Sequence, residues 1–93
     1  MGPVASAIRD KLAAALAPTL LQIDDESARH AGHAGAREGG ESHFHVTVES
    51  ALFAGESAVS RQRRVHRILA EELTGPVHAL SLTLRAPDEG SER

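Results

Sequence analysis

The chain has 93 residues, a formal net charge of −3 and no cysteine. Its length predicts one small domain with a modest core, its charge argues against a general nucleic-acid binder, and the lack of cysteine excludes disulfides and a thiol nucleophile. Phe44 and Phe53 are the only Phe, Tyr or Trp residues, so the core must be built from Leu, Val, Ile and Ala.

The sequence shows no membrane-spanning or secretion segment. No apolar run approaches the roughly 20 residues that a membrane helix needs. Arg9, Asp10 and Lys11 interrupt the N-terminal stretch where a secretion signal must be apolar, and Asp10 also counts against an amphipathic transit peptide. We therefore expect a cytoplasmic protein. Lys11 is the single lysine among ten basic residues and Ala is abundant, a composition typical of a GC-rich bacterial gene.

A helix and then a strand are predicted at the start of the chain. Residues 3–16 place apolar side chains at helical spacing, with Pro3 suited to the first turn and Pro18 following the last. The apolar stripe of this helix consists of Val4, Ile8, Leu12, Ala15 and Leu16. Residues 19–24 form an apolar run that the acidic residues after it end, which indicates a strand.

A long polar segment separates this strand from a second one. Residues 25–41 are rich in glycine, and a loop of this length in a small domain is usually functional or mobile. Residues 42–50 alternate strictly, with one side formed by Phe44, Val46 and Val48 and the other by His43, His45, Thr47 and Glu49. Such alternation predicts a half-buried strand.

A second helix is predicted over residues 59–73, after a tight connection over 51–58 that has room for one helical turn. Ser57 or Ser60 is suited to cap it, and its buried face consists of Val65, Ile68, Leu69 and Leu73. Acidic residues occupy its last turn and arginines its first half, the reverse of the order that the helix dipole favours. These arginines are therefore a candidate face for a partner or a nucleic acid, with a solvated charged face as the alternative: Arg61, Arg63, Arg64 and Arg67.

Residues 77–85 predict a third strand, because Thr74-Gly75-Pro76 ends the helix and apolar side chains then alternate. The polar tail from residue 88 to 93 is expected to be disordered, which leaves residues 1–87 as the folded domain. The order of elements predicts an α+β fold with both helices packed on one face of a three-stranded sheet. That face is expected to be built from Leu80, Leu82, Leu84, Phe44 and Val46.

Histidine is the residue type that most suggests a site. The chain has six histidines, four of them between His30 and His45, and no cysteine. Imidazole binds zinc, copper, nickel and iron, and it replaces thiolate on one iron of some [2Fe–2S] centres. Clustered surface histidines are the alternative, and His45 and His66 are expected to face solvent or to pack. For His78, strict alternation predicts a place on the face of Leu80, where a backbone hydrogen bond would satisfy the residue.

Five segments in fixed order resemble the BolA family over about residues 4–87. They are Asp25–Ser27, Glu41–Phe44, Phe53–Glu56, Arg61–Leu73 and Val77–Leu82. The resemblance implies an α-β-β-α-β fold similar to a type II KH domain and partnership with a monothiol glutaredoxin. The heterodimer is expected to share a [2Fe–2S] cluster, with thiolates from the glutaredoxin and its glutathione. Alone, the chain is expected to be monomeric and to hold no stable cluster, because two imidazoles cannot replace four ligands.

The resemblance also implies candidate ligands. His78 matches the family's invariant histidine, and a loop histidine is expected to be the second ligand. His30 is the first candidate for that role, and His33 in the same loop and His43 beside Phe44 are the others. The Gly-rich insertion over residues 32–40 makes the loop longer than in many relatives, so the choice among the three stays open.

Nucleic-acid binding is the main alternative function, and catalysis is not expected. A KH domain clamps nucleotides with a GXXG loop between two helices. The chain contains Gly32-His33-Ala34-Gly35, but between two predicted strands, and the connection Ala54–Ser57 lacks the pattern. The arginines would then contact phosphate in a transcription regulator. No Ser/His/Asp order, nucleophile elbow or phosphate loop is present, and Asp24–Glu26 are expected to end a strand rather than to act as acid and base.

Overall fold

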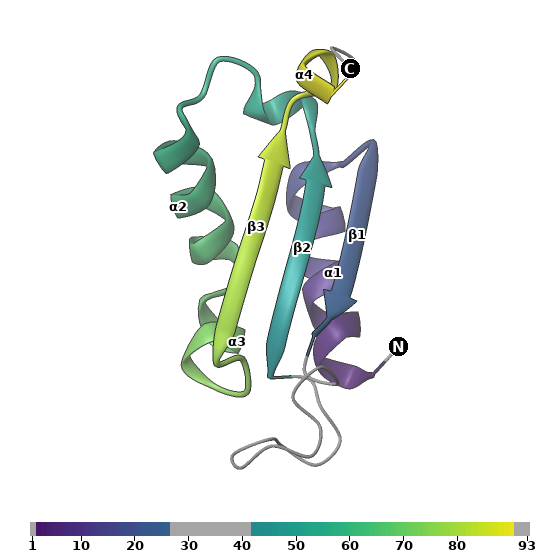
Figure 1. Ribbon diagram of the computed structural model, residues 1–93, viewed down its shortest axis with the longest axis vertical. Coiled ribbons are helices and arrows are strands. Elements are labelled where there is room, and N and C mark those ends of the chain that lie inside the picture. Colours follow the sequence, from purple (N-terminus) through teal and green to yellow (C-terminus); the bar gives the residue numbers. More distant parts are fainter. Residues whose placement is uncertain (1, 27–41, 91–93) are drawn as a thin grey trace.

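Three strands form one mixed sheet in the computed structural model, which describes residues 2–26 and 42–90. The central strand β2 (His43–Glu49) pairs antiparallel with β1 (Leu20–Asp25) and parallel with β3 (Ala79–Arg85) (Figure 1). A parallel pair cannot be joined by a hairpin, so the chain between β2 and β3 must cross over one face of the sheet. This topology confirms the predicted strands to within two residues at each end.

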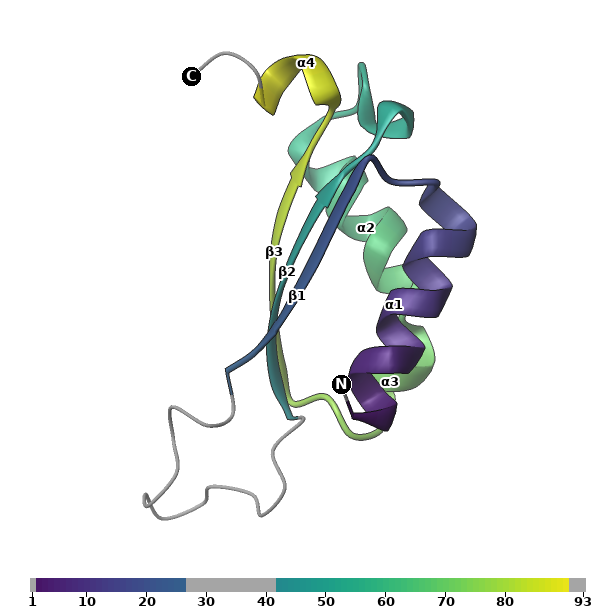
Figure 2. The ribbon, with the colours of Figure 1, turned by 90° about the vertical axis from the view of Figure 1, so that its right-hand side faces the viewer.

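The helices lie on one face of the sheet, and the described part of the chain leaves the other face uncovered (Figure 2). They are α1 (Pro3–Leu16) and, in the crossover, α2 (Ala58–Ile68) and α3 (Ala70–Thr74). A 3-10 helix, η2 (Ala51–Phe53), precedes α2, and a short helix, α4 (Pro87–Gly90), follows β3. The predicted α+β fold is confirmed. None of the helices in residues 2–26 and 42–90 is long and apolar enough to span a membrane.

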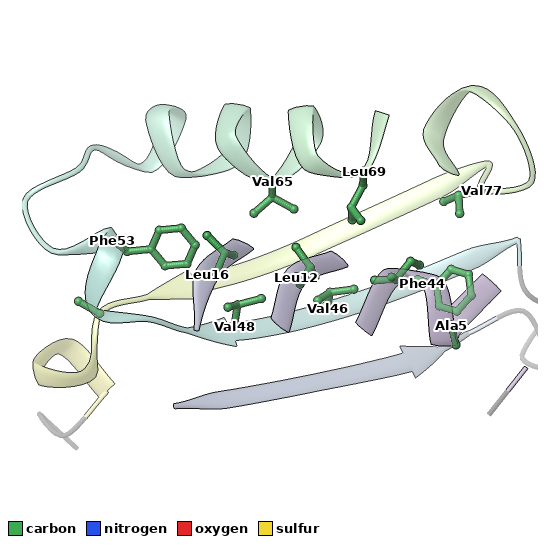
Figure 3. Packing of buried hydrophobic residues seen from close by; sticks show 12 residues of the cluster. Ala5, Leu12, Leu16, Phe44, Val46, Val48, Phe53, Val65, Leu69 and Val77 are labelled. Atoms are coloured by element: carbon green, nitrogen blue, oxygen red, sulfur yellow. The ribbon is translucent and has the colours of Figure 1, made fainter. Parts of the chain in front are cut away.

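The core fills the space between the helices and the sheet. Phe44, Val46 and Val48 on β2 are buried, and their partners in register on β3 are the leucines expected on the same face, Leu80, Leu82 and Leu84. Figure 3 shows the side chains of β2 pointing toward those of α1 and α2. Because strand side chains alternate between faces, the pattern of residues 42–50 fixes which side of β2 the helices cover.

The buried stripe of α1 differs from the predicted one: Ala5 is also buried, and Val4 packs against the core while only partly buried. Its buried residues are Ala5, Ile8, Leu12 and Leu16, whereas Ala15 is exposed. Ala15 and Leu16 point about 100° apart around the helix, and Leu16 is the one that faces the core. Pro3 occupies the first turn, as its fixed φ angle favours.

The predicted helix over residues 59–73 is interrupted at Leu69. Ser57 caps α2, since its Oγ accepts a hydrogen bond from the Ser60 N–H at 3.1 Å. Leu69 then leaves helical geometry, with φ −101° and ψ 21°, while its side chain stays buried. The next turn, α3, is tied to α1 by Lys11, whose Nζ lies 2.7 Å from Glu71 and 2.8 Å from Glu72.

The polar tail expected to be disordered begins with a helical turn, α4. Pro87 is its first residue, and the Glu89 carboxylate accepts a hydrogen bond from the Ala86 N–H at 3.1 Å, an interaction that caps the turn. The Arg61 guanidinium forms two bonds of 2.7 Å to the same carboxylate. Arg61 therefore attaches α4 to α2, and residues 87–90 belong to the fold.

Replacing Leu12 with Ala should lower the free energy of unfolding by about 2–5 kcal/mol, because it leaves a cavity beside the sheet. Leu12 is fully buried in the centre of α1. Urea denaturation measures the change. Val59→Ala is the matched control, since Val59 is 58% exposed, and it should change the free energy by less than about 0.5 kcal/mol.

Glu89 should make folding stability depend on acidity. Its bonds to Arg61, and then to the Ala86 amide, lower the pKa of the carboxyl from 4.5 to about 2 in the folded chain. A depressed pKa in the folded state stabilises the fold fully above the unfolded value, and that stabilisation is lost as the pH falls through the folded value. The difference in unfolding free energy between wild type and Glu89→Gln should therefore shrink between pH 4.5 and about 2. A difference that stays constant over this range would contradict the assignment.

Candidate imidazole site

The starts of β2 and β3 lie together at one end of the sheet, because the two strands run in the same direction (Figure 1). His43 is the first residue of β2 and pairs in register with Ala79, the first residue of β3. His78 directly precedes Ala79 and is exposed. It lies before the strand rather than in it, so strand alternation does not place its ring on the face of Leu80. The parallel pairing instead places it beside His43.

The rings of His43 and His78 have centroids 6.5 Å apart and planes tilted by 32°. Ser42 contacts both segments that carry them. Its carbonyl accepts hydrogen bonds from the N–H of His78 at 2.7 Å and of Ala79 at 3.1 Å, and its Oγ lies 2.9 Å from Nδ1 of His43. Ser42 is almost fully buried and His43 is half-buried, so the site has a fixed inner part and an exposed outer ring.

Imidazole is a side chain that transition metals bind. Within residues 2–26 and 42–90, no group of three or more His, Cys, Asp or Glu residues could hold a metal ion. The described residues therefore supply two donors, whereas a four-coordinate iron or zinc needs four. The pair of His43 and His78 does not by itself complete such a site.

Of the other four histidines, the structure describes only His45 and His66. His30 and His33, together with the Gly32–Gly35 motif, lie outside the described residues. His45 lies on the face of the sheet that the described helices leave uncovered, where its ring nitrogens contact Ser81 Oγ at 2.6 Å and Thr83 Oγ1 at 3.1 Å. His66 is exposed on α2. Neither His45 nor His66 joins the pair, in agreement with the sequence-based expectation.

Two of the four candidate arginines are engaged within the chain. The Arg61 side chain is only 11% exposed; besides Glu89 it donates to the carbonyls of Glu56 and Leu84, and its guanidinium lies 5.8 Å from the centre of the Phe53 ring. Arg64 forms an ion pair with Glu56, which lowers the pKa of that carboxyl. The guanidinium groups of both arginines already bond acceptors within the chain, so fewer of their donors are available to a partner.

Arg63 and Arg67 remain as outward-facing charges. Both are exposed on α2, and within the described residues no ion pair or hydrogen bond of their side chains is found. Arg63 also lines a shallow pocket of about 340 Å³ on the outside of α2, with Ala58, Val59, Gln62 and His66. The candidate partner face is therefore smaller than the arginine pattern predicts.

Sequence reasoning gave Ser42 no role. A serine at the start of a strand is expected to be a turn residue, and its only signal is its place directly before His43. Its importance depends on the pairing of β2 with β3, which joins residues far apart in the chain.

Comparison with known proteins gives consistent results. Residues 12–89 match the family model described as BolA-like protein. The human BolA-like protein 1 is 48% identical over 92 residues, which is 99% of this chain and 64% of that protein. The Escherichia coli DNA-binding transcriptional regulator BolA is 47% identical over 75 residues, covering 81% of this chain and 68% of the relative.

A solved structure confirms the fold. The BolA domain of SufE1 from Arabidopsis thaliana superposes with a TM-score of 0.84 at 38% identity, covering 96% of this chain and 98% of that one. The chain spans about 64% of the length of the mammalian relatives that it matches.

Proposed function

The chain belongs to the BolA family, and on this premise we propose that it is the partner of a monothiol glutaredoxin, with which it shares a histidine-ligated [2Fe–2S] cluster. The function would be cluster assembly, cluster trafficking or iron sensing. In the heterodimer, the glutaredoxin and its glutathione would supply thiolates to one iron, and this chain would supply imidazoles to the other. When bound, the cluster would supply a redox-active and transferable group.

The exposed His78 beside His43 is the observation that carries this proposal. The chain has no cysteine, so its bonds to iron must come mainly from imidazole, and imidazoles replace two thiolates on one iron in known [2Fe–2S] centres. A half-site with two imidazoles fits a cluster whose remaining ligands belong to a partner. The exposure of His78 allows its ring to reach a cluster held at the surface of a second protein.

The second imidazole has three candidates. The family resemblance favours His30, with His33 as the neighbouring choice. His43 is the candidate whose ring the described residues place beside that of His78. The described chain leaves the sheet at Glu26, whose N–H donates to the His43 carbonyl at 2.7 Å, and it returns at Ser42. The described residues on either side of 27–41, the range that contains His30 and His33, thus lie beside His43.

His78→Ala should abolish the distinct visible absorption and circular dichroism of the heterodimer reconstituted with iron, sulfide and glutathione-loaded monothiol glutaredoxin. Because His78 is exposed, the free energy of unfolding should change by no more than about 0.5 kcal/mol. His66→Ala removes another exposed histidine and should keep the wild-type spectrum. If the His78→Ala heterodimer keeps both spectrum and stability, His78 is not a ligand.

DNA binding is a second candidate function, because one relative is the Escherichia coli DNA-binding transcriptional regulator BolA and because α2 carries two exposed arginines. Arg63 and Arg67 lie one turn apart, so both can contact neighbouring phosphates along one strand of a duplex. The net charge of −3 works against strong binding without further contacts.

If the chain binds DNA through α2, replacing Arg63 or Arg67 with Ala should weaken binding at all sequences alike. Each substitution should also make the slope of log affinity against log salt shallower by about 1. Fluorescence anisotropy at several salt concentrations measures both effects. Arg9→Ala on α1 is the control and should leave the slope unchanged. Equal slopes for wild type and both α2 variants would exclude this surface.

A further inference from the structure

We infer that Ser42 is a positioning residue that joins His43 and His78 into one imidazole pair, with His43 as the second ligand to the iron that His78 binds. This inference rests on the proposed function and names the ligand that the family resemblance leaves open. Three observations carry it: the two backbone bonds from Ser42 to the His78 segment, the contact of its hydroxyl with the His43 ring, and its burial.

The Ser42 carbonyl fixes the backbone that carries His78. It accepts from the N–H of His78 at 2.7 Å and from that of Ala79 at 3.1 Å, so both residues are attached to the start of β2. His78 lies outside β3, where the ladder between strands would otherwise not hold it. The position of the exposed ring relative to His43 therefore depends on these bonds.

The Ser42 hydroxyl fixes the ring of His43. Its Oγ lies 2.9 Å from Nδ1, so a metal that approaches His43 meets Nε2 on the other side of the ring. A ring that binds metal through Nε2 carries its proton on Nδ1, and a hydroxyl oxygen can accept a hydrogen bond from that N–H. Histidine ligands in metal sites usually donate their second N–H in this way, which fixes tautomer and ring orientation.

Because Ser42 is buried, water cannot easily take the place of its hydroxyl beside the His43 ring. Ser42 is 1% exposed, so water has little access to Nδ1 if the hydroxyl is removed. Ser50, which follows the other end of β2, is fully buried and uses its hydroxyl to bond the Leu16 carbonyl at 2.7 Å. Ser42 and Ser50 are thus both buried and directly flank β2. Ser42 contacts a histidine ring, whereas Ser50 bonds a backbone carbonyl.

The number of imidazole nitrogens bound to the cluster tests whether His43 is a ligand. In the reconstituted heterodimer with 15N-histidine in this chain, pulsed electron paramagnetic resonance of the one-electron-reduced cluster should show two bound imidazole nitrogens. His43→Ala should reduce the count to one. His45→Ala is the matched control on the same face of β2, and it should leave the count at two. If His30→Ala or His33→Ala removes a nitrogen and His43→Ala does not, the inference is wrong.

Two measurements test the positioning role of Ser42: the rate at which the cluster is lost, and the tautomer of the His43 ring. Ser42→Ala should speed cluster loss to a chelator by about 10–100-fold, the usual effect of removing a partner of a metal ligand. In the isolated chain, the same change should shift the 15N resonances of the His43 ring, which report where its proton lies. Ser50→Ala should leave both unchanged, even where it lowers stability.

The outcomes separate this inference from the proposed function. If the wild-type heterodimer forms no cluster, the proposed function fails. If it forms one and Ser42→Ala behaves like Ser50→Ala in both measurements, the positioning role is refuted. If Ser42→Ala does not fold, the nitrogen count in His43→Ala still decides whether His43 is the ligand.

Discussion

The parallel pairing of β2 with β3 is the constraint on which the rest of this structure depends. It requires a long connection, and that connection forms α2 and α3 and covers one face of the sheet. It also brings the starts of both strands to the same end, which is why His43 and His78 are neighbours although 34 residues separate them in sequence (78 − 43 − 1). A slip of one residue in this register would turn Phe44, Val46 and Val48 away from the helices, so the core and the imidazole pair are fixed together.

Charged side chains hold the crossover helices in place at two points. Arg61 joins the start of α2 to the end of β3 and to α4, and Lys11 joins α1 to α3. The bonds to Glu71 and then Glu72 raise the pKa of Lys11 above its usual value. The unfavourable order of charges along the second helix therefore has an internal explanation, because two of its arginines bind acidic residues of the same chain. Arg63 and Arg67 are exposed and keep both interpretations, a partner face or a solvated charged face.

The sequence predicted what depends on local pattern and missed what depends on contacts between distant segments. Alternation in residues 42–50 identified β2 and its buried face, since strand periodicity is visible within a few residues. No glycine or proline marks the interruption at Leu69, so helical periodicity continued through it. The capping interaction of Glu89 had a local signal, a proline followed two residues later by an acid, but the polarity of the tail outweighed it. His78 and His43 were both recognised as candidates, whereas their proximity and the contacts of Ser42 follow only from the direction and register of β3.

The site combines a half-buried histidine with an exposed one, an arrangement that would suit a cluster transferred between proteins. His43 is half-buried and its Nδ1 contacts the Ser42 hydroxyl, whereas His78 is exposed and its backbone N–H donates to the Ser42 carbonyl. Imidazole is a neutral ligand that protons compete for, so it holds iron less firmly than thiolate does. Under the proposed function, a chain that offers two imidazoles and no cysteine would become a cluster ligand only when a partner supplies thiolates. The lack of cysteine, which excludes a thiol nucleophile and a disulfide, is thus also the property that would make cluster binding conditional on the complex.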